Sequence, residues 1–169
     1  MNEPQPVPTV WTRRLQIATA VSSAVFTVGT AAQNFLVINL EMIEHSMRLS
    51  GLGPSDAAAQ APGLLAFLRT VGALFIVGNA LGLLAPRGWT WVFWTAVIVN
   101  IGQAAGPLGM IPPVVYRSSI ELYGPAGILP TVITDGGAFF VALALVASFA
   151  RYRTPWARLR RPATGPAPR

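Results

Sequence analysis

The chain has 169 residues, of which 53% are hydrophobic and only 11% are charged, with a mean hydropathy of +0.53. Soluble domains average about 25% charged residues, so this composition excludes an ordinary soluble domain and predicts a membrane protein. The absence of cysteine excludes disulfides and thiol chemistry, and the single histidine, His45, argues against a multi-histidine metal or haem site. We therefore expect neither a metal nor another cofactor.

Four long apolar stretches, separated by charged or Pro/Gly-rich breaks, make up most of the chain. They cover residues 15–40, 64–85, 89–110 and 128–150. Each is long enough to cross a bilayer, which needs about 20 apolar residues per helix. The sequence thus predicts an all-α fold, an integral membrane four-helix bundle over residues 1–150, with a basic cytoplasmic tail over residues 151–169.

The first stretch has no helix breaker before Gly51, so we expect one helix that continues past the membrane surface. Asn34, Glu41 and His45 would then lie on one face of it, at spacings of seven and four residues. A separate short helix over residues 56–60 is expected to follow, because Pro62-Gly63 would end it.

The second and third stretches each place small residues four positions apart. They read Gly78-Asn79-Ala80-Leu81-Gly82 and Gly102-Gln103-Ala104-Ala105-Gly106. Small residues at this spacing let helix backbones approach closely. We expect packing within the bundle, and the alternative is dimerisation through one of these faces.

Arginine placement predicts the topology, because short cytoplasmic segments are enriched in Arg and Lys. Nine of the 12 arginines lie before the first stretch, between the second and third, or after the fourth, whereas Arg48, Arg69 and Arg117 lie on the other side. We expect a multi-pass protein of the cell membrane with both termini cytoplasmic and the basic tail, with Trp156, on the anionic inner leaflet. Topology alone explains the net charge of +6, so no nucleic acid is expected as a partner.

Polar side chains inside the spans are the candidates for function, because they are costly in lipid and usually face the bundle interior or a wet cavity. Arg69 and Asp135 lie ~8 and ~10 Å from the outer ends of their spans, so we expect them to pair. They would help to form an outward-facing polar pocket without a metal. Its expected binding residues are Asn34, Glu44, His45, Arg69, Asn100 and Gln103. The alternative is structural: the amides bond helices together and Arg69 reaches the surface.

The layout of the second to fourth stretches resembles a known family. Leu68-Arg69-Thr70-Val71-Gly72 opens the second, an aromatic-rich third stretch follows, and Pro130 and Asp135-Gly136-Gly137 open the fourth. This pattern resembles the DoxX-like group of small four-helix bacterial membrane proteins, over about half of the chain. Some members are linked to quinone-dependent oxidoreduction, so the resemblance implies a quinone-like molecule as one possible ligand.

Three functions fit these observations. The first is an accessory protein that binds a membrane lipid, a partner membrane protein or a second copy through its pocket. The second is a small enzyme acting on an isoprenoid or quinone-like apolar substrate, with Glu41 or Asp135 as general acid or base. The third is a transporter, which would need to oligomerise because four spans are few for alternating access.

Overall fold

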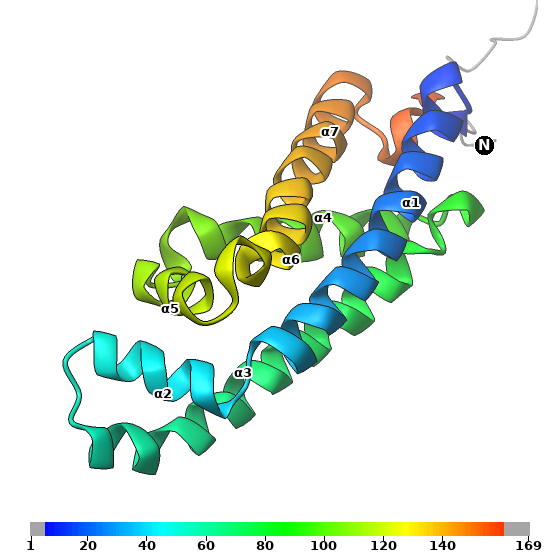
Figure 1. The fold of residues 1–169 in the computed structure, drawn as a ribbon. Helices are drawn as coiled ribbons and strands as arrows, with labels where there is room; N and C mark the ends of the chain where they lie inside the picture. The colour runs from blue at the N-terminus through cyan, green and yellow to red at the C-terminus, as the bar shows by residue number, and fades with distance from the viewer. Residues whose placement is uncertain (1–5, 161–169) are drawn as a thin grey trace, which may run out of the picture.

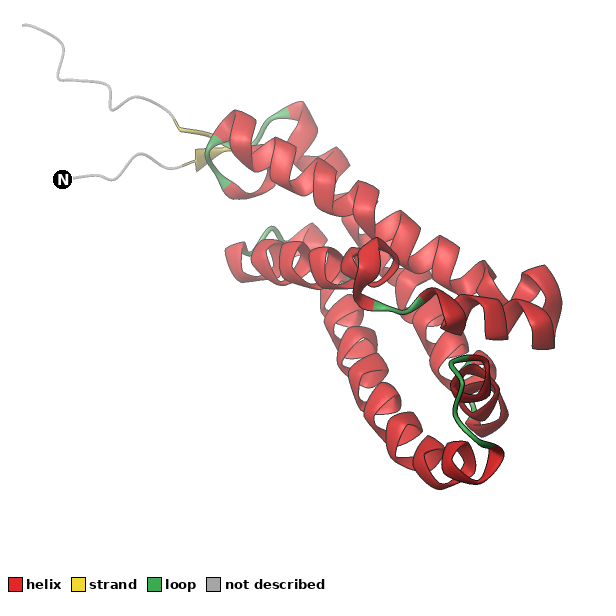
Figure 2. Ribbon diagram, turned by 90° about the vertical axis from the view of Figure 1, so that its left-hand side faces the viewer, coloured by secondary structure: helices red, strands yellow, loops and turns green. Residues whose placement is uncertain are grey.

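The computed structural model describes residues 6–160, and this part of the chain is almost entirely helical (Figures 1 and 2). The longest helices are α1 (Val10–Ala32), α3 (Pro54–Gly82), α4 (Thr90–Ala105) and α7 (Gly137–Tyr152). With their continuations they give four segments long and apolar enough to cross a membrane: Val10–Val37, Pro54–Arg87, Thr90–Gly109 and Pro113–Tyr152. The all-α prediction is confirmed, and the four segments fit a multi-pass membrane protein.

Shorter elements connect or extend these helices. Two amphipathic helices are α2 (Leu40–Leu49) and α5 (Pro113–Tyr123), and α6 (Leu129–Thr131) is a single turn. The π-helical segments are η1 (Gln33–Val37), η3 (Gly106–Met110) and η5 (Val132–Gly136), and the 3-10 segments are η2 (Ala85–Arg87), η4 (Gly124–Ile128) and η6 (Pro155–Ala157).

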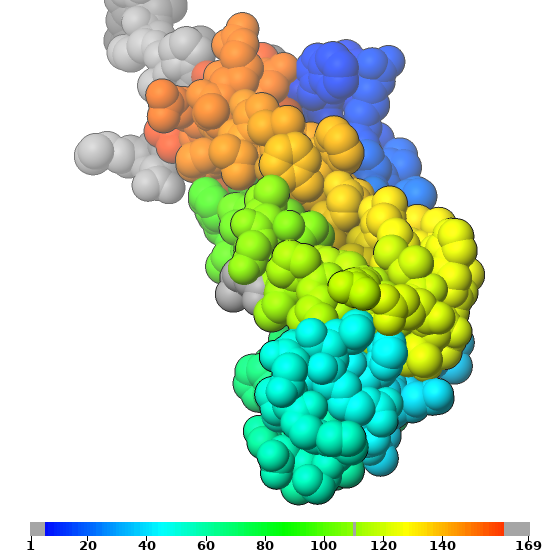
Figure 3. Space-filling model, turned by 60° about the vertical axis from the view of Figure 1, so that its left-hand side comes forward, coloured from blue at the N-terminus to red at the C-terminus, as the bar shows by residue number. Residues whose placement is uncertain are grey.

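The molecule has two different ends (Figure 1). At the terminal end, the strand β1 (Pro6–Val7) pairs antiparallel with β2 (Leu159–Arg160), which brings both ends of the described chain together. At the opposite end, which we name the cap end, α2 and α5 pack together with the first turns of α3. Figure 3 shows α2, in cyan, at the far end of the molecule from α7, in orange. Residues 1–5 and 161–169 lie outside the described part, so the predicted tail is placed only as far as Arg160.

The bundle is closely packed at its glycines. Helices α1 and α3 run side by side (Figure 1), and a Cβ atom on Gly82 would meet the hydroxyl of Ser23. A Cβ atom on Gly78 would lie 2.6 Å from a methyl group of Val99 in α4. Both glycines of the α3 motif therefore pack within the bundle, as the sequence predicts.

The buried face of α1 is polar, whereas its exposed face is apolar. The buried residues of this helix are Thr12, Gln16, Thr19, Ser23, Phe26 and Thr30. The exposed side chains include Val10, Trp11, Ile17, Val21, Val25 and Val28. A helix with this inverted pattern suits an apolar solvent outside and a polar bundle interior, as in a membrane.

Two helix predictions at the cap end are wrong. The first segment does not continue into α2, because Ile38 adopts an extended conformation and Asn39 begins a new helix, its side chain accepting a hydrogen bond from the Met42 backbone nitrogen. Conversely, α3 runs unbroken through Pro62 instead of ending there. Its early turns bury Ala57 and Ala61 completely, and α3 packs on α2. This packing outweighs the single hydrogen bond that proline removes.

The terminal end contains the larger apolar cluster, and the chain's own tail completes it. Trp156 is fully buried against Phe93, with ring centroids 5.2 Å apart, and its Nε1 donates to the carbonyl of Trp89 at 2.9 Å. Thr9 and Thr12 donate to the carbonyl of Ala157. The prediction that Trp156 lies on the membrane surface is therefore wrong, because its ring is buried at the end of the bundle.

Candidate functional site

A cluster of buried polar side chains lies inside the bundle, and every membrane-length segment contributes to it. None of its members is more than 6% exposed. They are Thr30 and Asn34 from the first segment, Asn79 from α3, Asn100 and Gln103 from α4, and Thr134 and Asp135 from η5. We call this set the polar core.

Gln103 is the central link of the polar core. Its Nε2 donates to Thr30 Oγ1 at 3.0 Å, and its Oε1 accepts from Asn79 Nδ2, also at 3.0 Å. One side chain of α4 thus bonds to both α1 and α3. This part of the polar core holds helices together, which agrees with the structural interpretation of the amides. Such bonds contribute about 0.6 kcal/mol on average inside membranes.

Three amide oxygens of the polar core have no donor among the described residues. They are Oδ1 of Asn34, Oδ1 of Asn79 and Oδ1 of Asn100. Asn34 and Asn100 use their nitrogens to bond the backbone carbonyls of Arg69 and Ala96, at 3.2 and 2.8 Å. A buried acceptor without a donor costs about 1–3 kcal/mol. These three oxygens therefore lower the stability of the bundle.

Asp135 has only neutral partners. Thr134 Oγ1 donates to its Oδ1 at 3.0 Å, and Gly106 approaches so closely that an added Cβ would lie 3.5 Å from its Oδ2. Both ion pairs of residues 6–160 lie at the cap end, and Arg69 is exposed on α3. The predicted Arg69–Asp135 pair is therefore wrong. Equal depth along two helices does not fix the direction in which side chains point.

The helix geometry is irregular beside the polar core. Asn34 lies in the π-helical segment η1, Asp135 lies in η5, and η3 begins three residues after Gln103. Isolated π-helical turns inside α-helices occur frequently at functional sites. Of these three segments η5 is the one that lies between α-helices, whereas η1 and η3 end α1 and α4.

A recess opens beside Asp135, between η3, α5 and η5. It has a volume of about 300 Å³ and is lined by Pro107, Tyr116, Ile128, Thr131, Val132 and Gly136. We call it the Tyr116 recess. The hydroxyl of Tyr116 is buried without a partner in the described chain. A recess with apolar walls and one unpartnered hydroxyl group is suited to an amphiphile, a molecule with a polar head and an apolar chain.

The predicted site residues on α2 lie outside the polar core. Glu41 is exposed and Glu44 is half-buried, while Met42 and Ile43 form the buried face of this helix. His45 Nε2 lies 2.7 Å from Glu121, whose other oxygen accepts from Arg117 Nε at 2.7 Å. The hydrogen bond from Arg117 and then that from His45 lower the pKa of the Glu121 carboxyl group.

The structure therefore divides the predicted pocket. Asn34, Asn100, Gln103 and Asp135 lie in the bundle interior, whereas Glu41 and Arg69 are exposed. The helix break at Asn39 separates Glu41 from the interior, because it turns α2 away from the axis of α1. Arg69 is close to Asn34 through its backbone carbonyl, but it lies on the exposed side of α3.

Sequence reasoning missed other polar groups. Thr30 and Thr134 belong to the polar core and Tyr116 lines the recess, but none of the three was among the predicted site residues. The signal for Thr30 is present in the sequence, because the polar side chains of α1 recur every three or four residues, the spacing of one helix face. The position of Tyr116 depends on how α5 folds against η5, which no local pattern encodes.

Comparisons of the chain with protein families, with curated proteins and with solved structures give no match. The resemblance to the DoxX-like group therefore stays a prediction, and the site itself is the basis for inferring the function.

Proposed function

We propose that the chain is a multi-pass membrane protein with cytoplasmic termini that binds a membrane amphiphile, a lipid or quinone-like molecule, in the Tyr116 recess. The supporting observation is that Tyr116, whose hydroxyl is buried without a partner in the described chain, lines an apolar recess together with Gly136, the neighbour of the buried Asp135. A volume of about 300 Å³ is at the lower end of the range for ligand pockets. It suits a small polar head whose chain continues into the surrounding lipid.

The charge distribution supports the cytoplasmic placement of the termini. Every described carboxylate except Asp135 lies at the cap end: Glu41, Glu44, Asp56 and Glu121. The terminal end contains arginines and none of the described carboxylates. Cytoplasmic segments are the ones enriched in arginine, so the terminal end belongs inside the cell and the cap end outside.

The proposed binding uses hydrogen bonds in a water-poor setting. The phenol of Tyr116 donates to a carbonyl or hydroxyl oxygen of the ligand, and Ile128 and Val132 contact its apolar part. Exposed apolar side chains continue along this segment, with Val132 58% and Phe140 69% exposed. A lipid chain would lie along this surface without displacing the protein core.

Lipid analysis of the purified protein tests this proposal. Full-length protein is extracted in native nanodiscs, and its lipids are quantified by mass spectrometry relative to the surrounding membrane. We expect one amphiphile to be enriched and Tyr116→Phe to reduce the enrichment about tenfold, the equivalent of one lost hydrogen bond of about 1.4 kcal/mol. The control is Tyr123→Phe on the same helix, whose hydroxyl bonds to Asn39 instead. Equal enrichment in both variants would contradict the proposal.

A small membrane enzyme is the second candidate, because a buried carboxyl group near the recess could serve as general acid or base toward the same ligand. Asp135→Asn separates the two functions. An enzyme requires that this variant retains the ligand but fails to restore the phenotype of a deletion strain. If Asp135→Asn restores the phenotype fully, and Glu41→Gln at the other candidate carboxylate does so too, the enzyme function is contradicted. The accessory function then remains.

A further inference from the structure

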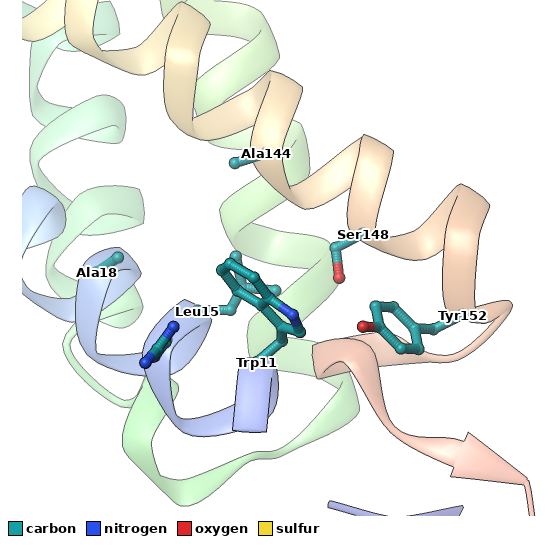
Figure 4. Close-up of a pocket in the computed structure, with 7 residues that line it drawn as sticks. Trp11, Leu15, Ala18, Ala144, Ser148 and Tyr152 are labelled. Carbon is teal, nitrogen blue, oxygen red and sulfur yellow. The ribbon is translucent and has the colours of Figure 1, made fainter. Parts of the chain in front are cut away.

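A second recess lies toward the terminal end, between α1 and α7 (Figure 4). It has a volume of about 390 Å³ and is lined by Trp11, Arg14, Leu15, Ala18, Ala144, Ser148 and Tyr152. We call it the α1–α7 groove. It shares no residue with the Tyr116 recess or with the polar core, so any role it has is additional to the proposed function.

The groove combines a narrow apolar floor with a polar edge. Ala18 on α1 and Ala144 on α7 have small side chains, which leave space between the two helices. Figure 4 shows Ser148 and Tyr152 on the same side of the groove, both close to the ring of Trp11. The hydroxyl of Ser148 is buried and has no partner among the described residues. Ser148 therefore has a hydrogen-bond donor that the described chain does not use.

Arg14 of α1 adds a positive charge to the lining of the groove. Its guanidinium lies over the ring of Trp11, 5.3 Å from the ring centre, and a similar contact of 5.7 Å joins Arg151 to Tyr152. Neither ion pair in residues 6–160 involves an arginine of the terminal end. An aromatic ring orients a guanidinium without neutralising it. Arg14 is therefore held in place and still able to bind an anion.

The surrounding charges favour an anion at this end. Seven arginines of the described chain lie here, and every described carboxylate lies in the cap end or the bundle interior. The seven are Arg13, Arg14, Arg87, Arg151, Arg153, Arg158 and Arg160. Basic residues near an anionic membrane surface are attracted to it. Their combined field attracts anionic lipids, while the groove adds a specific geometry.

We propose that the α1–α7 groove binds one anionic glycerophospholipid of the cytoplasmic leaflet. The phosphate contacts the Arg14 guanidinium, and an acyl chain lies on the apolar side chains of Leu15 and Ala18. Arginine suits phosphate because its planar fork of donors matches the phosphate oxygens. The apolar floor distinguishes a lipid from free phosphate, which would leave the floor uncovered.

Lipid titration of the full-length protein in detergent tests this site. The affinities for dioleoyl phosphatidylglycerol and dioleoyl phosphatidylcholine are measured by native mass spectrometry, with inorganic phosphate as a further probe. We expect phosphatidylglycerol to bind more tightly than phosphatidylcholine. Arg14→Gln should weaken phosphatidylglycerol binding about tenfold, since a hydrogen bond to a charged group is lost.

Arg13→Gln is the matched control, because it removes the same charge from the adjacent, exposed position outside the groove. It should change the affinity by less than about twofold, the loss expected from a screened surface charge. Equal losses in the two variants would mean diffuse attraction and would overturn the proposal. Equal affinity for the two lipids, or phosphate competing as well as phosphatidylglycerol, would also overturn it.

A second variant keeps the test decisive if Arg14→Gln disturbs the fold through its contact with Trp11. Ala18→Leu fills the floor without changing any charge, and it should weaken phosphatidylglycerol binding while phosphate binding stays the same. Normal lipid binding by folded Ala18→Leu would overturn the proposal. Tyr123→Phe, at a residue that lines neither recess, should leave phosphatidylglycerol affinity unchanged. Arg14→Gln and Ala18→Leu change only the α1–α7 groove, so failure at this groove is distinguishable from failure at the Tyr116 recess.

Discussion

The two ends of the molecule are stabilised in different ways. At the terminal end, Trp156, Phe93 and Leu145 are fully buried, and the chain's own tail covers them. At the cap end, α2 and α5 are held by a smaller cluster around Met42 and Ile43 and by exposed ion pairs. Burial of large side chains contributes more than exposed polar pairs. The terminal end should therefore determine global stability, while the cap end should open locally.

Trp156→Ala should cause the largest loss. The substitution leaves a cavity beside Phe93 and removes the hydrogen bond to Trp89, so the free energy of unfolding should fall by about 3–5 kcal/mol. Trp91→Ala is the control, because this tryptophan is 47% exposed near the same end. Chemical unfolding in detergent measures both variants. Similar losses would show that the buried tail does not stabilise the bundle.

Gly82→Ala should have the next largest effect. A methyl group at this position meets the Ser23 hydroxyl where α1 and α3 approach, so the two helices must separate at a cost of about 1–3 kcal/mol. Gly63→Ala, in the same helix, is the control because its added Cβ would have no neighbour within 4 Å. That change should stabilise the helix by up to about 1 kcal/mol. A fall in the unfolding midpoint for both would contradict close packing at Gly82.

Asn39→Ala tests whether the cap end opens separately. Asn39 accepts a hydrogen bond from the Met42 backbone nitrogen and donates one to the Tyr123 hydroxyl at 2.7 Å. Losing the cap should cost about 1 kcal/mol, and amide hydrogen exchange should accelerate in α2 while α1 and α4 stay protected. Asn39→Ser keeps a capping oxygen and should exchange more slowly. Uniform acceleration throughout the protein would mean that both ends unfold together.

Glu121 should have the smallest effect, and only in acid. Its pKa is lowered from the ordinary value of 4.5, chiefly by the hydrogen bond from Arg117 and then by that from His45. A carboxyl group with a lowered pKa in the folded state stabilises the fold above pH 4.5, and this contribution is lost as the pH falls through the lowered pKa. The protection of α5 amides from hydrogen exchange, measured relative to the unfolded chain at the same pH, should therefore fall slightly below pH 4.5. Glu121→Gln should show no such loss of protection. The same loss in this variant would mean that another group causes it.

The sequence predicted the features that depend on local composition. The four apolar stretches and the packing of Gly78 and Gly82 follow from length, hydropathy and side-chain size alone. The break before α2 could not be predicted in this way, because residues 35–40 contain neither proline nor glycine. Asn39 begins the helix partly through Tyr123, which lies 84 residues further along the chain.

The candidate site was predicted in part, for a similar reason. Gln103 and Asp135 could be recognised as intramembrane polar residues because they lie within apolar stretches. The predicted Arg69–Asp135 pair assumed that both spans are regular α-helices and that residues at the same depth in the membrane are neighbours. The π-helical segment η5 changes the direction of Asp135, and Arg69 lies on the exposed side of α3. The direction in which a side chain points around its helix axis depends on tertiary packing, and the hydropathy of the sequence does not describe this packing.

The inverted pattern of α1 changes how variation in this helix should be interpreted. Polar side chains in membrane spans usually face other helices, because they are costly in lipid. Replacing Gln16 of α1 or Asn34 of η1 by an aliphatic residue would therefore remove a group that faces other helices. Exchanges among aliphatic residues at Val21 or Val28 should be nearly neutral, because these side chains are exposed. Hydropathy alone therefore does not indicate which positions of this segment tolerate substitution.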